Sequence, residues 1–276
     1  MITVQTKCLS LDAIYESGQC FRWTPCGAGY RIAAKNRILH AYQDDAQGSL
    51  RLDCTPEEFE ACWKAYFDLD TDYAAIIRRI PENDGYLKNA AAYGQGIRIL
   101  RQDPWETLIT FILSQRKNIP AIRQTVEKLC AAGCRVIGED EGEPIYAFPT
   151  PEEILVMTPD ALKACGLGYR AEYVRRTAED FCQKGIRAEN YIDLDDEALL
   201  AALCCFYGVG KKIALCTMLF GFHRMNAFPV DVWMQKVGAR YPDGIPTERY
   251  APWGGVMQQY MFAYERYLAA EEKNHP

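Results

Sequence analysis

The sequence lacks the marks of a secreted, membrane-spanning or strongly basic protein. Its 276 residues include 31 Lys and Arg against 37 Asp and Glu, so the net charge is −6, whereas nucleic-acid-binding proteins usually carry excess basic charge. No apolar stretch approaches the roughly 20 residues that cross a membrane, and the first residues lack a basic start followed by an apolar run. We therefore expect an intracellular, cytoplasmic protein without membrane segments. A nucleic-acid partner would need a local basic face, which an acidic molecule can still have.

Cysteine pairs of the metal-binding kind are also missing. The 12 cysteines are scattered, and no two have the spacing Cys-x-x-Cys. In an intracellular protein they are expected to be reduced thiols, and we predict no metal site. The sequence has a large apolar share instead: 49% of the residues are hydrophobic and 12% are aromatic, enough for the core of one large domain or of two to three small ones.

The order of apolar runs and turn residues predicts an α+β fold. Short apolar runs near the N-terminus alternate with turn residues such as Gly27 and Gly48, which indicates a meander of antiparallel strands. Helical signals dominate from about residue 72 onward, where capping residues repeatedly precede a proline. We predict an N-terminal sheet domain over residues 1–95 and helical domains over residues 96–276, with an acidic surface loop at 135–149. Strands are expected at 20–23, 30–34, 38–42 and 50–52, and helices from Pro56, Pro104, Pro151 and Pro159 (the last ending at Gly166), from Arg170 to Lys184 with a stop at Gly185, after Asp231, and over about 253–271.

Residues 206–216, which read Phe-Tyr-Gly-Val-Gly-Lys-Lys-Ile-Ala-Leu-Cys, predict a tight turn between two helices over about 195–223. Gly208 and Gly210 suit such a turn because glycine tolerates positive φ. The turn leaves backbone N–H groups unpaired at the start of the second helix, and such groups bind phosphate. Lys212 lies just inside that helix. Asp231 follows Pro229 at an expected helix N-cap, and a short return of the chain can bring it close to Lys212.

This block resembles the helix-hairpin-helix DNA glycosylases, whose Leu-Pro-Gly-Val-Gly-x-Lys-x-Ala hairpin is followed by Pro-Val-Asp. Tyr207 replaces the proline of the hairpin, and Phe228 precedes Pro229. Some glycosylases with this hairpin carry an iron–sulfur cluster on cysteines that follow the catalytic aspartate. Here the last cysteine is Cys216, which precedes Asp231, so that part of the chain cannot supply four thiolates and we expect no cluster.

Three further motifs restrict the resemblance to one family of these glycosylases, in which they occur in the same order. Ser17–Trp23 (SGQCFRW), Gln102–Glu106 (QDPWE) and Gly166–Ala171 (GLGYRA), together with the hairpin, are similar to the 8-oxoguanine DNA glycosylase/lyases. The resemblance implies excision of 8-oxoguanine from damaged double-stranded DNA through a lysine Schiff base, followed by β-elimination. It implies no redox cofactor and allows a monovalent cation at the turn carbonyls. We expect a monomer.

The resemblance assigns Lys212 as the nucleophile that attacks the sugar C1′ and Asp231 as the carboxylate that stabilises positive charge there. Asp231 can do this while it caps a helix. Without the resemblance, a solvated helix lysine or a simple phosphate contact explains Lys212 as well as a nucleophile does. Cys216 lies at i+4 from Lys212 on the same helix face, where the family has a cysteine in the base pocket, and a lysine–thiolate dipole against the base is one option.

The base pocket is likewise assigned by resemblance. The carbonyl of Gly18 would accept from N7–H, which 8-oxoguanine has and guanine lacks, Gln258 would bond the pairing edge, and Phe262 would stack on the base. Without the resemblance, a turn glycine explains Gly18 equally well. The sequence alone would favour a core aromatic for Phe262 and a surface glutamine for Gln258.

Most DNA contacts are assigned in the same way. Tyr169 would insert where the base has left the stack, and Arg170 would contact the partner base; otherwise this segment is a helix C-cap turn with a packing aromatic. The family's opposite-base loop departs here, because Arg116 replaces an asparagine and Ala121 an arginine, so weaker selection for cytosine is expected. The predicted DNA-binding residues are Arg116, Lys117, Asn118, Tyr169, Arg170, Gly208, Val209, Gly210, Lys211 and Trp233, the last standing where some relatives have a histidine.

Two alternatives stay open at this point. A monofunctional glycosylase for alkylated purines, which uses water as the nucleophile, would need Asp231 but not Lys212. A non-catalytic helix-hairpin-helix module would explain the hairpin glycines, but it gives no reason for Asp231 or for the turn at Gly18.

Overall fold

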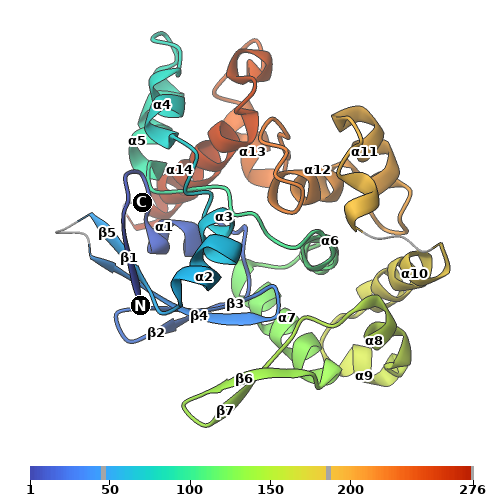
Figure 1. Cartoon of the computed structure of the whole chain (residues 1–276). Coiled ribbons are helices and arrows are strands. Elements are labelled where there is room, and N and C mark those ends of the chain that lie inside the picture. Colours follow the sequence, from blue (N-terminus) through green and yellow to red (C-terminus); the bar gives the residue numbers. More distant parts are fainter. Residues whose placement is uncertain (45–47, 185–187, 275–276) are drawn as a thin grey trace.

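The computed structural model describes residues 1–44, 48–184 and 188–274, and it confirms the predicted α+β class. An antiparallel sheet of five strands lies at one side of the molecule, and helices make up the rest (Figure 1). The strand order is β1-β5-β4-β3-β2. The strands span Ile2–Gln5 (β1), Trp23–Cys26 (β2), Gly29–Ala34 (β3), Arg37–Asp44 (β4) and Ser49–Leu52 (β5).

The sheet and the helices that follow it enclose a first hydrophobic core. Leu39, which pairs with Ile32 across β3 and β4, is fully buried there together with Trp63 and Phe67. The predicted helix start at Pro56 is confirmed, because Thr55 and Glu58 form a reciprocal capping box. The helices around this core are α1 (Leu11–Glu16), α2 (Pro56–Glu58), a π-helical turn (Phe59–Trp63) and α3 (Lys64–Tyr66).

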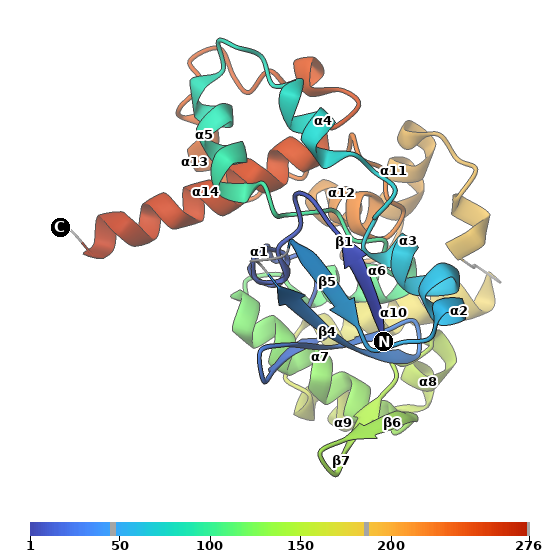
Figure 2. The same cartoon turned by 60° about the vertical axis from the view of Figure 1, so that its left-hand side comes forward.

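Helices build the remainder of the chain. The longest is α14, which extends past the rest of the molecule toward the C-terminus (Figure 2). The helices that pack most closely against α14 are α5 and α13. The helices are α4 (Tyr73–Arg78), α5 (Gly85–Gly94), α6 (Pro104–Leu113), α7 (Ile119–Gly133), α8 (Pro151–Val156), α9 (Pro159–Ala164), α10 (Arg170–Gln183), α11 (Asp196–Cys204), α12 (Lys211–Phe220), α13 (Val232–Gly238) and α14 (Gly254–Asn274), with 3-10 turns at Ala188–Tyr191 and Thr247–Tyr250.

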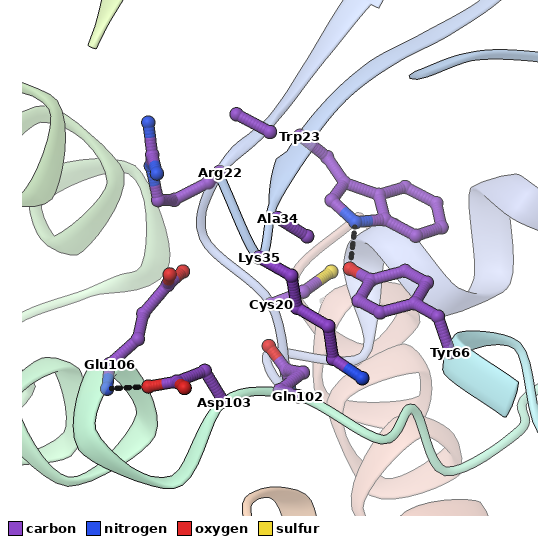
Figure 3. Close-up of a pocket in the computed structure, with 10 residues that line it drawn as sticks. Cys20, Arg22, Trp23, Ala34, Lys35, Tyr66, Gln102, Asp103 and Glu106 are labelled. Atoms are coloured by element: carbon purple, nitrogen blue, oxygen red, sulfur yellow. Dashed lines mark hydrogen bonds between the residues drawn. The ribbon is translucent and has the colours of Figure 1, made fainter. Parts of the chain in front are cut away.

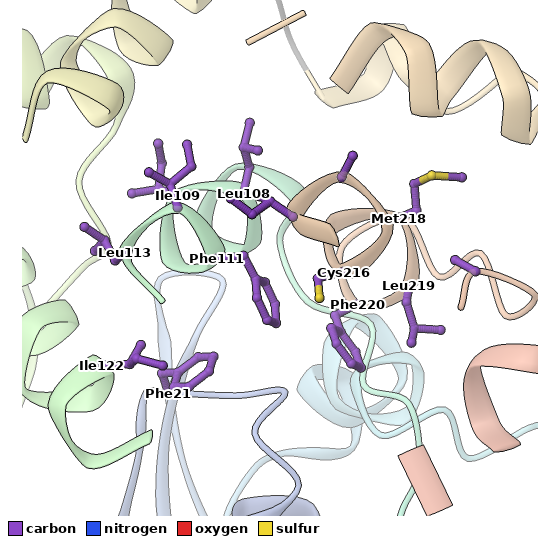
Figure 4. Packing of buried hydrophobic residues seen from close by; sticks show 14 of the residues in the cluster. Phe21, Leu108, Ile109, Phe111, Leu113, Ile122, Cys216, Met218, Leu219 and Phe220 are labelled. Carbon is purple, nitrogen blue, oxygen red and sulfur yellow. The ribbon is translucent and has the colours of Figure 1, made fainter. Parts of the chain in front are cut away.

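A second core lies among these helices and reaches back to the N-terminal part. Figure 4 shows Phe111, Cys216 and Phe220 pointing into the space between α6, α12 and the segment that carries Phe21. Phe111 stacks on Phe220 with ring centroids 5.5 Å apart, and it meets the edge of Phe21 at 5.9 Å. Phe21 therefore packs the segment before β2 against α6, and Phe111 connects it to Phe220 of α12.

A buried carboxylate also joins the two parts of the chain. Asp68, which is 2% exposed, pairs with Arg101 at 3.0 Å and His223 at 3.3 Å and accepts a hydrogen bond from the Tyr73 hydroxyl at 3.0 Å. Burial alone would raise the pKa of Asp68, but the hydrogen bond and charge of His223, helped by Arg101, outweigh burial and lower this pKa to about 2. Asp68 is therefore a charged anchor between the N-terminal region and the segment after α12.

A small pocket between the sheet and α6 holds a second, half-buried carboxylate (Figure 3). Its volume is about 10 Å³, and its walls include Arg22, Asp103 and Glu106. Asp103 caps α6 by accepting from the Glu106 N–H at 2.8 Å, as the sequence predicts. Burial raises the pKa of Glu106 to about 7, against the opposing charge of Arg22. Arg22 itself bonds Glu127 at 3.4 Å.

The prediction of an acidic surface loop at 135–149 is wrong. The segment forms a two-stranded hairpin of β6 (Val136–Asp140) and β7 (Glu143–Tyr146). Its turn residues Glu141 and Gly142 both have positive φ, as tight hairpin turns require. Asp140 bonds Arg31 and His40 of the main sheet at 3.1 and 3.2 Å. The acidic residue thus serves as an anchor for the hairpin.

Other boundaries differ from the predictions by a few residues. The strand expected at 20–23 begins at Trp23, and β1 was not predicted. The predicted stop of α10 at Gly185 lies outside the described residues. Within the described ranges, no helix is both long enough and apolar enough to cross a membrane.

Candidate active site

The hairpin glycines lie between α11 and α12, and Gly208 can be replaced by no other residue without strain. Its φ is +81°, and an added Cβ would lie 2.3 Å from the Tyr173 ring. Gly210 is the N-cap of α12 and offers no side-chain acceptor to the first amides of the helix. Those amides are suited to bind an anion, because the positive end of the helix dipole lies there as well.

The predicted N-cap role of Asp231 is present in the structure. Its Oδ1 accepts from the backbone N–H groups of Trp233 and Met234, both at 3.0 Å. These two bonds fix the carboxyl group at the start of α13 while using only one of its oxygens.

Lys212 and Cys216 lie one turn apart on α12. The Lys212 ammonium is 5.1 Å from the centroid of the Phe111 ring. Burial raises the pKa of the Cys216 thiol, whereas the charge of Lys212 and a hydrogen bond from it act in the opposite direction. The net effect is a raised pKa, so the structure favours a neutral thiol and not the thiolate of a lysine–thiolate dipole.

Lys212 and Asp231 line the same cavity, whose volume is about 740 Å³. A cavity of this size is typical of ligand sites and has room for a nucleotide. The predicted base-pocket residues Gly18, Cys216, Gln258 and Phe262 line it too. The walls therefore come from both ends of the chain and from α12 and α13 between them.

Gly18 lies in the turn after α1 with φ +73°, and an added Cβ would meet the Cδ1 of Ile119 at 3.1 Å and the Phe262 ring at 3.7 Å. A side chain at this position would press against the wall of the cavity. The glycine thus keeps the backbone itself at the surface of the cavity.

The opposite-base loop forms another part of the wall. Arg116, Lys117 and Asn118 all line the cavity. Arg116 has a φ of +53°, and Asn118 caps α7 by accepting from the Ala121 N–H at 3.0 Å. The Lys117 ammonium donates to the carbonyl of Gly166 at 2.9 Å. Burial, together with the positive charges of Arg170 and Lys128, lowers the pKa of Lys117.

Tyr169 and Arg170 lie beside the cavity and do not line it. The Tyr169 side chain is 49% exposed, as an inserting residue requires. Arg170 is only 7% exposed, and its guanidinium donates to the carbonyls of Gln115 at 2.9 Å and Leu167 at 3.2 Å. These bonds use the guanidinium to hold the loops together, so the structure does not favour the predicted contact of Arg170 with the partner base.

The hairpin residues also lie outside the cavity wall. Val209 is buried, so only its backbone can contact DNA, whereas Lys211 is exposed at the start of α12. Trp233 does line the cavity, with the Lys236 ammonium 4.5 Å from the centroid of its ring. Sequence reasoning missed other lining residues, among them Phe21, Phe111, Phe220, Gln259 and Arg266. Of these five, Arg266 alone had a positional signal, because it lies one turn beyond Phe262.

No group of three or more His, Cys, Asp or Glu side chains is placed to hold a metal ion in the part of the chain that the structure describes.

Comparison with known proteins agrees with this arrangement. Residues 1–108 match the family model for the 8-oxoguanine DNA glycosylase N-terminal domain, and residues 109–245 match that for HhH-GPD superfamily base excision DNA repair proteins. A Saccharomyces cerevisiae N-glycosylase/DNA lyase is 31% identical over 84% of this chain and 68% of its own length. The chain belongs to the 8-oxoguanine DNA glycosylase family.

Solved structures of similar proteins agree with this membership. MBOgg1, in complex with a low-affinity DNA ligand, is 32% identical with a TM-score of 0.90, covering 97% of this chain and 96% of that one. The Clostridium acetobutylicum 8-oxoguanine glycosylase/lyase, bound to duplex DNA with cytosine opposite 8-oxoG, is 31% identical with a TM-score of 0.88, covering 96% and 94%.

Proposed function

We propose that this family member is a bifunctional DNA glycosylase and AP lyase that excises 8-oxoguanine from duplex DNA and then incises the strand. The observation that carries the proposal is the shared cavity, in which the amine of Lys212 and the capped carboxylate of Asp231 lie with the predicted base-pocket residues. A glycosylase needs a cavity of this kind because the target nucleotide must leave the stack before its C1′ can be reached.

The reaction follows from these two groups. Lys212, as the neutral amine, attacks C1′ and forms an N–C1′ bond while the C1′–N9 bond breaks and the base leaves with a proton. The C1′–O4′ bond of the adduct then breaks as a proton moves to O4′, which gives the ring-opened Schiff base, and removal of a C2′ proton expels the 3′ phosphate by β-elimination. Asp231 stabilises the positive charge that develops at C1′. Its two backbone hydrogen bonds keep it in place without a conformational change.

The base pocket supplies recognition. The Gly18 carbonyl accepts from N7–H of the damaged base, Phe262 stacks on its face, and Gln258 bonds its pairing edge. The positive φ of Gly18 and its tight approach to Ile119 and Phe262 support this role, because only a glycine leaves the carbonyl uncovered in such a turn.

The DNA backbone is held at the start of α12. The amides of the Gly208–Lys211 turn bind phosphate. The turn carbonyls can coordinate a monovalent cation, and the chemistry needs no redox cofactor. Tyr169 fills the space that the base leaves. Affinity should therefore fall steeply as salt rises. We further propose that the enzyme acts as a monomer in the cytoplasm.

The opposite base is selected weakly. Lys117 and Asn118 are bonded within the protein, and Ala121 has no group that could hydrogen-bond cytosine. Arg116 remains as a donor to base acceptors or to phosphate. A large preference for cytosine over adenine would refute this part of the proposal.

The decisive experiment is incision of an 8-oxoguanine duplex with each of the four partner bases, run with borohydride trapping. The native protein should give a covalent protein–DNA adduct, and Lys212→Gln should give neither adduct nor incision. Lys211→Gln, one residue away, is the matched control and should still be trapped. Base release without trapping would indicate the water-based chemistry of an alkylpurine glycosylase, and binding without release would indicate a non-catalytic hairpin module.

A further inference from the structure

Two adjacent glutamines of α14 line the cavity, although only one of them has a role in the proposed function. Gln258 is 3% exposed and Gln259 is 4% exposed. The Nε2 of Gln259 donates a hydrogen bond to the Oε1 of Gln258 at 2.9 Å. The Oε1 of Gln259 is buried and has no hydrogen-bond partner among the described residues. The Gln259 amide is thus held by a hydrogen bond at its Nε2 and has none at its Oε1.

This bond decides which half of the Gln258 amide remains for a ligand. An amide carries an acceptor oxygen and a donor NH₂ on opposite sides. When Gln259 donates to Oε1, Gln258 presents mainly N–H donors to the cavity. When both amides turn over, Gln258 donates its Nε2 to the Oε1 of Gln259, and its own oxygen faces the cavity.

Nothing else in the described protein holds the Gln259 amide in one orientation, because its other end is unpaired. A terminal amide torsion has broad minima that differ by a half-turn. Two orientations of the pair are therefore available, and the base that enters the cavity can select between them by its own donors and acceptors.

The chemistry of the purines specifies what each orientation accepts. The pairing edge of 8-oxoguanine carries donors at N1–H and at the exocyclic amine, and therefore requires the oxygen of Gln258. The edge of 8-oxoadenine carries an acceptor at N1 beside the donor amine at C6, and its N1 acceptor can be satisfied only by the Gln258 NH₂. Both bases have the N7–H group that Gly18 is proposed to bond, so they differ only at the edge that the two glutamines face.

We propose that Gln259 is a positioning residue for base selection. It sets the orientation of the Gln258 amide. When both amides turn over, the pocket changes from one that suits an oxidised purine with an acceptor at N1 to one that suits an oxidised purine with a donor at N1. The inference rests on the proposed base contact of Gln258 and adds a second residue that acts through it.

The test compares excision of 8-oxoguanine and 8-oxoadenine from duplexes that are otherwise identical. Single-turnover rates are divided by each variant's own rate on an abasic-site duplex, which contains no base to select. Gln259→Glu presents only acceptors when ionised, so Gln258 must turn its NH₂ toward residue 259 and its oxygen toward the base. The ratio of 8-oxoguanine to 8-oxoadenine excision should rise about fivefold or more. Gln259→Met, which has similar volume and no hydrogen bond, should not raise it.

A Gln258→Ala variant separates the inference from the function beneath it. If the native protein excises neither base, the proposed function itself fails, and the inference with it. If the native protein is active and Gln258→Ala changes the ratio, but Gln259→Glu and Gln259→Met have the same ratio as the native protein, only the inference is overturned. An unchanged ratio in Gln258→Ala also overturns it, because Gln259 acts only through Gln258. Thermal melts confirm that each variant is folded.

Discussion

Replacing Glu106 with glutamine should stabilise the protein at alkaline pH and leave it almost unchanged at acidic pH. The carboxyl group lies in the small pocket beside Arg22 (Figure 3). Burial raises its pKa from 4.5 to about 7, so the folded protein binds this proton more tightly than the unfolded chain does. The stabilising effect of the bound proton is therefore complete below pH 4.5 and is lost as the pH rises through 7.

The size of the effect follows from the shift. A difference of about 2.5 pKa units corresponds to about 3 kcal/mol at 1.36 kcal/mol per unit, which is an upper limit because the side chain keeps some exposure. The uncharged glutamine avoids this loss. Glu106→Gln should thus differ little from the native protein at pH 5 and exceed it by about 1–3 kcal/mol at pH 8.

The assay is urea unfolding of both proteins at several pH values from 5 to 8. Glu60→Gln is the control, because the Glu60 side chain is 66% exposed and surface charge changes usually alter stability by less than about 0.5 kcal/mol. A stability difference between Glu106→Gln and the native protein that does not vary with pH, or that reverses at pH 8, would refute the reasoning.

Three further predictions concern single residues. Asp231→Asn should keep the helix cap, with melting almost unchanged, yet lower single-turnover excision by about 100-fold or more; retained activity would contradict the proposed charge stabilisation. Asp68→Asn should lower the free energy of unfolding at pH 7 by about 2 kcal/mol. That deficit should shrink in urea titrations as the pH falls from 4 toward 2, because native Asp68 then becomes protonated; a deficit independent of pH would exclude an ionic anchor. Gly208→Ala should destabilise the fold by about 2 kcal/mol or more through its left-handed φ and the nearby Tyr173 ring and abolish duplex binding in a filter assay, whereas Gly210→Ala, with open space around it, should cost less than about 1 kcal/mol.

The parts of the fold that the sequence predicts well are those encoded locally. Asp103 and Thr150 precede a proline and cap the helices that were expected there. The hairpin at 136–146 was missed because its local composition, with Gly138 and several acids, is typical of a loop. Its stability comes from distant partners, since Asp140 bonds Arg31 and His40, and no local pattern encodes such contacts.

The same distinction applies to the site. The positions of Lys212 and Asp231 follow from a turn and a cap, so their approach could be foreseen. The burial of Arg170 could not, because it depends on the Gln115 carbonyl 55 residues away. Gln259 was missed because a glutamine beside another glutamine carries no periodic signal. Its significance lies in an unpaired atom that only the packed structure reveals.

The cavity is closed by residues from the two ends of the chain, with Gly18 on one side and Gln258 and Phe262 on the other. A nascent chain that had left the ribosome only as far as α13 would already contain Lys212, Asp231 and the Gly18 turn, yet would lack the wall that α14 contributes to the cavity. On the proposed function, translation therefore delivers the amine of Lys212 before the α14 wall that would contact the damaged base, and α14 would be the segment that restricts cleavage to damaged DNA. Truncations within α14 should accordingly be more harmful to fidelity than to the capacity to cleave abasic sites.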